Sequence, residues 1–137
     1  MHRYCHKDNE LKKLLAEFDE ADRDMMKANL EKIEKRIREC IHIMMLRKDN
    51  NYWDKFIPEG VSQRVDERIE KEIERYPYKE KELLLPAIKL TFCDIRDYMK
   101  IIRRNWEDFF EKIFKSKTEL EKHFNNLAEF RNAINHV

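Results

Sequence analysis

The C-terminal end of the chain carries polar side chains whose types and spacing suit chemistry on a phosphodiester. Arg131 and Asn135 are four residues apart, and so are Asn132 and His136, so each pair would share one side of a helix. A guanidinium group holds two phosphate oxygens and offsets charge in a transition state. An imidazole transfers protons near neutral pH, and an amide orients a hydroxyl group or the imidazole. These residues therefore predict a phosphate-directed site.

Helical periodicity predicts that Arg131 lies near the centre of the apolar side of the last helix. The apolar residues of that side, at steps of three or four, are Leu120, Phe124, Leu127 and Ile134. Because an unpaired buried guanidinium is costly, Arg131 needs a partner. Two interpretations are open. Either Arg131 pairs with a buried acid such as Asp94 or Asp97, and His136 is an ordinary residue near a helix end, or Arg131 faces a second subunit or a ligand.

The segment Phe130–His136 resembles the signature of HEPN domains, which is an Arg, then a polar residue, then a His after a spacer of four to six residues. The resemblance extends upstream to the Swt1-like branch of that superfamily and covers residues 27–137. The upstream segments that carry it are Trp53–Pro58, Phe92–Ile95 and Ile101–Phe109. It implies a small helical bundle that dimerises, so that two motifs meet in one cleft, and a metal-independent endoribonuclease activity.

The resemblance also implies a role for each motif residue. Arg131 would stabilise the phosphate, His136 would transfer a proton, and Asn132 would support both. Asn135 lies within the spacer and is not part of the signature. No cofactor is implied. Since the superfamily includes binding modules without activity, the alternative is a non-catalytic interaction module of a larger defence or toxin–antitoxin system, with a protein partner or antitoxin.

The whole sequence predicts an all-α fold, a helical bundle of about four to six helices with a long N-terminal helix. Charged and hydrophobic residues each make up 42%, and one Gly with three Pro is too few for an all-β fold with many tight turns. We expect an N-terminal helical extension over residues 1–26 and a HEPN-like domain over residues 27–137. The expected helices cover residues 9–18, 22–48, 61–75, 80–104 and 106–113, and the last begins at about 117. Pro86 either kinks the helix over residues 80–104 or marks its true start. Residues 52–60 are expected to form a loop packed by its aromatic side chains.

Charge and composition restrict the partners. With 29 basic and 28 acidic residues, net charge +1, any RNA site must be a local patch. Arg103 and Arg104, beside Trp106, are candidate RNA-binding residues through charge and stacking, or else a solvated helix end. A zinc site drawn from the scattered histidines and cysteines lacks any CxxC or HExxH spacing, so no metal is expected. Those residues are His2, Cys5, His6, Cys40 and His42.

No apolar run approaches the roughly 20 residues that span a bilayer. The N-terminus lacks a signal-peptide pattern, and the three cysteines are scattered. We therefore expect a cytoplasmic protein without membrane contact. The many Lys and Glu residues, with Gln63 as the single glutamine, are typical of thermophilic proteins.

Overall fold

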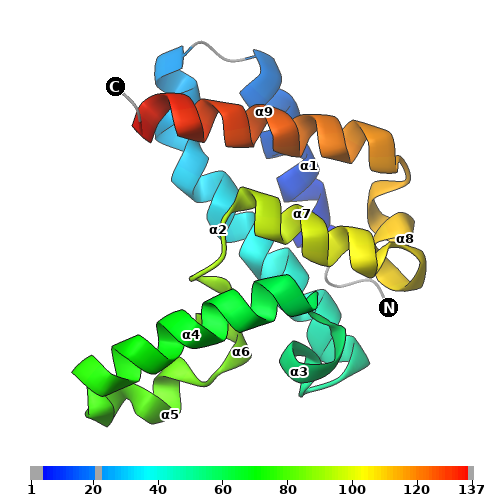
Figure 1. Cartoon of the computed structure of the whole chain (residues 1–137). Coiled ribbons are helices and arrows are strands. Elements are labelled where there is room, and N and C mark those ends of the chain that lie inside the picture. Colours follow the sequence, from blue (N-terminus) through cyan, green and yellow to red (C-terminus); the bar gives the residue numbers. More distant parts are fainter. Residues whose placement is uncertain (1–4, 21–22, 136–137) are drawn as a thin grey trace.

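The computed structural model describes residues 5–20 and 23–135, which contain helices and connecting turns but no strand (Figure 1). The predicted all-α fold is confirmed. The long helices are α1 (Cys5–Glu20), α2 (Arg23–Lys48), α4 (Glu59–Arg75), α7 (Ile95–Arg104) and α9 (Lys117–Asn135). Shorter elements are α3 (Tyr52–Phe56), η1 (Pro77–Lys79), α5 (Glu80–Leu83), α6 (Pro86–Leu90), η2 (Trp106–Phe110) and α8 (Glu111–Phe114).

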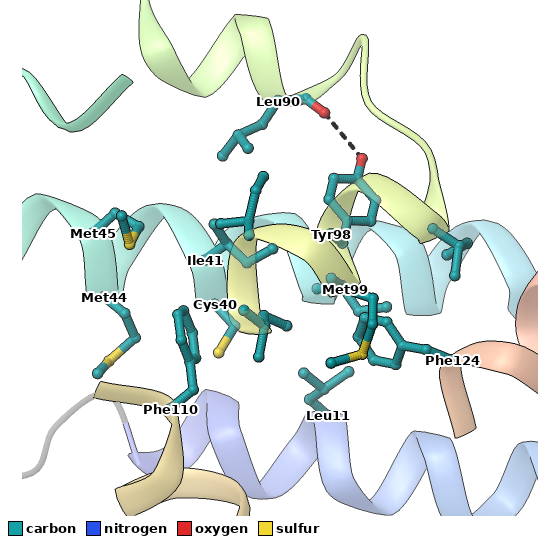
Figure 2. Packing of buried hydrophobic residues seen from close by; sticks show 14 of the residues in the cluster. Leu11, Cys40, Ile41, Met44, Met45, Leu90, Tyr98, Met99, Phe110 and Phe124 are labelled. Atoms are coloured by element: carbon teal, nitrogen blue, oxygen red, sulfur yellow. Dashed lines mark hydrogen bonds between the residues drawn. The ribbon is translucent and has the colours of Figure 1, made fainter. Parts of the chain in front are cut away.

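Helix α2 runs through the middle of the molecule and buries its isoleucine face. Ile33, Ile37 and Ile41 are each 0% exposed. Figure 2 shows side chains of several other elements converging on this region, among them Leu11 of α1 and Phe124 of α9. Helix α1 lies beside α2 and so contributes to the same core as the segment 27–137.

Four predicted helices agree with the structure. The expected first helix, over residues 9–18, lies within α1. The expectations over residues 22–48 and 61–75 correspond to α2 and α4, and the last helix begins at Lys117. Its start is set by Ser116, whose Oγ accepts a hydrogen bond from the backbone nitrogen of Glu119 at 3.2 Å. This is one half of the predicted capping box.

The expectation of one helix over residues 80–104 is wrong, because the chain forms α5, α6 and α7 there. Pro86 is in the first turn of α6, where its missing N–H costs nothing. Asp94 then caps α7. The Asp97 backbone nitrogen donates to Asp94 Oδ1 at 2.9 Å, and the Asp94 backbone nitrogen donates to Asp97 Oδ2 at 2.9 Å. This reciprocal capping box fixes the start of α7.

The expected loop over residues 52–60 contains the short helix α3, although its aromatic packing is as predicted. Tyr52 and Trp53 are buried, and Trp53 Nε1 donates a hydrogen bond to Asp66 Oδ1 on α4 at 3.1 Å. The expected short helix over residues 106–113 divides into the π-helical turn η2 and α8. Both segments therefore anchor aromatic side chains in the core.

The contact between α2 and α3 includes a pH-sensitive hydrogen bond. His42 Nδ1 lies 2.7 Å from the Tyr52 hydroxyl oxygen. Burial lowers the pKa of His42 below 6.5 and raises the pKa of Tyr52. The Tyr52 hydroxyl therefore donates a hydrogen bond to Nδ1 of the neutral His42 imidazole. Protonation of Nδ1 removes this acceptor.

We predict that acid weakens the fold through His42. Because its pKa is lower in the folded than in the unfolded state, its contribution to stability is present above pH 6.5 and is lost as the pH falls below that value. Urea denaturation of the natural protein and of His42→Gln, at pH 8 and pH 5.5, checks this. Between pH 8 and pH 5.5, the free energy of unfolding should fall more for the natural protein than for the variant. Equal losses would contradict the role of His42.

Candidate functional site

Arg131 lies near the C-terminal end of α9, is partly exposed, and forms an ion pair with another helix. Three residues of the predicted apolar stripe, Leu120, Phe124 and Leu127, are buried, and Ala128 and Phe130 join them in the core. The side chain of Ile134, the fourth, lies outside the described residues. Arg131 Nη1 pairs with Glu34 Oε1 of α2, and the side chains of Arg131 and Glu34 are 42% and 13% exposed. An internal acid therefore neutralises Arg131, and part of the guanidinium still reaches solvent.

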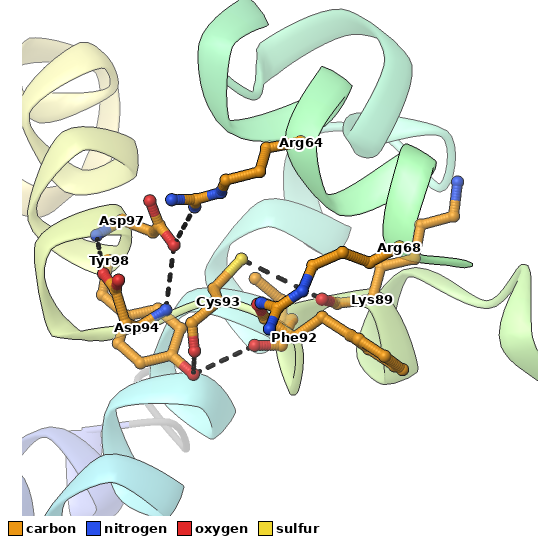
Figure 3. Close-up of polar contacts among 9 residues, drawn as sticks. Arg64, Arg68, Lys89, Phe92, Cys93, Asp94, Asp97 and Tyr98 are labelled. Atoms are coloured by element: carbon orange, nitrogen blue, oxygen red, sulfur yellow. Dashed lines mark hydrogen bonds and ion pairs between the residues drawn. The ribbon is translucent and has the colours of Figure 1, made fainter. Parts of the chain in front are cut away.

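The prediction that Asp94 or Asp97 would be that acid is wrong. Asp97, whose side chain is 2% exposed, pairs with Arg64 of α4, which raises the pKa of Arg64 (Figure 3). Asp94 caps α7, so both carboxylates are committed to the start of that helix. Neighbouring Cys93 stays a thiol rather than a nucleophilic thiolate, since burial raises its pKa to about 12. Asp94 and Asp97 therefore hold the start of α7 in place, and Cys93 offers no nucleophile beside them.

The start of α7 and the end of α9 together enclose a small hollow. The two helices lie side by side and run in opposite directions, so Arg96 comes close to Arg131 and Asn132 (Figure 1). The hollow has a volume of about 150 Å³, and Asp94, Ile95 and Ala128 complete its lining. Two guanidinium groups and an amide face one carboxylate there, which provides donors for a phosphate group.

The other predicted site residues are placed only in part. Asn132 is exposed at the rim of the hollow. Asn135 ends α9, but its side chain and all of His136 lie outside the described residues. The association of Arg131 with His136 therefore stays a prediction.

The candidate RNA-binding residues Arg103 and Arg104 point to different partners. Arg103 Nε pairs with Glu121 of α9 at 2.9 Å, and the Arg103 side chain is 50% exposed. Arg104 donates to the backbone oxygens of Ile57 at 2.7 Å and of Lys55 at 3.2 Å, so it holds the end of α3. Trp106 is only 8% exposed and offers no open ring face for base stacking.

Sequence analysis did not single out Glu34 or Arg96. Glu34 follows the buried Ile33 on α2, and no spacing within α2 indicates which side chain it meets on α9. Arg96 did carry a signal, because Arg96, Lys100 and Arg103 recur at steps of four and three residues along one side of a helix.

We predict that Glu34 and Arg131 are energetically coupled. A double-mutant cycle of Glu34→Gln and Arg131→Gln, measured by urea denaturation, should give a coupling free energy of about 1 kcal/mol, between that of exposed ion pairs and that of buried charged hydrogen bonds. Each single variant leaves its partner charge unpaired and should be less stable than the natural protein. Additive single-variant effects would show that the pair contributes nothing.

Within the described residues, no group of three or more His, Cys, Asp or Glu side chains is placed to hold a metal ion. No described helix is long and apolar enough to cross a bilayer. Comparison with models of protein families, with curated proteins and with solved structures finds no match to this chain.

Proposed function

We propose that the chain is a HEPN-like domain that binds single-stranded RNA at the end of α9 and cleaves it without a metal ion. The observation that carries the proposal is the hollow in which Arg131 and Asn132 of α9 meet Arg96 of α7. The partly exposed guanidinium of Arg131 keeps donors for a phosphate although one nitrogen is paired with Glu34. The resemblance of Phe130–His136 to the HEPN signature adds the proton-transfer residue.

In the proposed reaction the 2′-hydroxyl of a ribose attacks the adjacent phosphorus. The 2′-oxygen–phosphorus bond forms, the bond from phosphorus to the 5′-oxygen breaks, and the products carry a 2′,3′-cyclic phosphate and a 5′-hydroxyl. His136 transfers the proton of the 2′-hydroxyl to the departing 5′-oxygen, and Arg131 stabilises the charge that develops on the phosphate oxygens. Glu34 orients the guanidinium. The chain acts as a dimer in which two such sites face one cleft.

A second function, a non-catalytic interaction module for a protein partner or antitoxin, is favoured by a different observation. The Glu34 carboxylate already gives Arg131 an internal partner, so a structural role accounts for its place on α9. In addition, Tyr78, Leu84 and Leu85 are 79%, 49% and 53% exposed around η1 and α5, far along the chain from the motif. RNA cleavage does not explain these apolar side chains.

We predict that the purified protein cleaves labelled single-stranded RNA in EDTA, and that Arg131→Ala and His136→Ala each reduce the rate by about 100-fold or more. Asn132→Ala should have a smaller effect in the same direction. Mass spectrometry of the products should detect the 2′,3′-cyclic phosphate.

Lys122→Ala is the matched control, because Lys122 is an exposed cation on the opposite side of α9. It should cleave at the natural rate. Cleavage that survives in Arg131→Ala and His136→Ala would indicate a contaminating nuclease. A folded, dimeric natural protein without activity would favour the interaction module.

A further inference from the structure

The solvent side of α7 carries a row of cations. Arg96, Lys100 and Arg103 lie at steps of four and three residues, are all exposed, and share one side of the helix. Helical rise places Arg96 and Lys100 about 6 Å apart along the axis. The opposite side of α7 is buried in the core, so this row is a fixed surface of the fold.

This row borders a groove between α7 and α9. The hollow beside Arg131 shares Arg96 with a second hollow of about 180 Å³, which Lys100 and Asn125 also line. The second hollow shares Arg103 with a third of about 290 Å³, which extends to Lys117 at the start of α9. The first two hollows share Ile95 and Arg96 and so lie next to each other along the two antiparallel helices. The second and third hollows share Arg103, whose ion pair with Glu121 of α9 lies between them.

The middle of the groove is positively charged. No carboxylate lines the second hollow, although Glu121 pairs with Arg103 nearby. Arg96 and Lys100 form no ion pair with any part of the chain that the structure describes. The other acidic residues along the hollows are Asp94 at one end and Glu107 and Asp108 at the other, and Asp108 pairs with Lys48 of α2 at 2.6 Å. Cations without internal partners, in a row, complement a polyanion.

We propose that a single strand of RNA lies along the α7–α9 groove, with its phosphates against Arg96, Lys100 and Arg103, and that the groove leads the strand to Arg131 and Asn132. The occupant is unpaired because neighbouring helix axes lie only about 10 Å apart, too narrow a path for a duplex. The Asn125 amide in the middle hollow gives the strand a neutral hydrogen-bonding group. This inference rests on the proposed function and extends its site from one phosphate to several.

The test measures binding rather than cleavage. Fluorescence anisotropy with a labelled RNA strand of about 12 nucleotides is followed over a range of KCl concentrations, in the His136→Ala background so that the strand stays intact. The variant is Arg96→Gln with Lys100→Gln. The matched control is Lys71→Gln with Arg75→Gln, which removes two exposed cations at the same spacing from α4. Circular dichroism confirms that every variant is folded.

Loss of two phosphate contacts should reduce the magnitude of the slope of log affinity against log salt by about 1.4, and should weaken binding about tenfold near 0.1 M salt. The control substitutions should change neither the slope nor the affinity. If RNA binds but both double variants bind it equally, the groove proposal fails, and cleavage that still depends on Arg131 and His136 keeps the proposed function. If the protein binds no RNA at all, both fail. Binding of a labelled polyglutamate peptide in place of RNA would overturn the proposal in favour of an acidic protein partner.

Discussion

The isoleucine face of α2 is stable only when it is buried, and the packing of the helices around it depends on this constraint. Ile33, Ile37 and Ile41 are fully buried, and each contributes about 1.5–3 kcal/mol through burial. Helices α1, α7 and α9 supply the apolar surface that covers α2 and its neighbours in the same core. Because α7 and α9 lie antiparallel there, the start of one meets the end of the other (Figure 1). Core packing thus brings Arg96 to Arg131, which neither helix alone determines.

Polar contacts then set the direction of α7. The capping box of Asp94 and Asp97 begins the helix, and the pairing of Asp97 with Arg64 ties that end to α4 (Figure 3). At the other end, the buried Asn105 side chain donates to the backbone oxygens of Phe56 at 3.2 Å and Ile101 at 2.8 Å. Such buried groups are tolerated because their hydrogen bonds are satisfied. With both ends fixed, the exposed row on α7 is held rigidly beside α9.

Sequence alone predicts α1, α2, α4 and α9, because each has a sustained apolar stripe. It failed over residues 80–104, where apolar residues continue at helical spacing across Pro86 and the capping box at Asp94. The partner of Arg131 could not be predicted, since an ion pair between helices depends on how they pack. Arg103 and Arg104 are neighbours in sequence and so suggest one RNA-binding site, but neighbours in a helix point about 100° apart. One lies at the groove and the other holds α3.

The pairing of Glu34 with Arg131 has opposite consequences for the two proposed functions. In an interaction module the ion pair fully accounts for Arg131, because it satisfies the charge of that residue within the chain. In a nuclease it orients the guanidinium and leaves other donors for a phosphate, but it also cancels much of the local positive charge. With a net charge of +1, the molecule as a whole cannot compensate. Affinity for RNA would then have to come from nearby cations without internal partners, and Arg96 and Lys100 of α7 are the side chains placed to supply it.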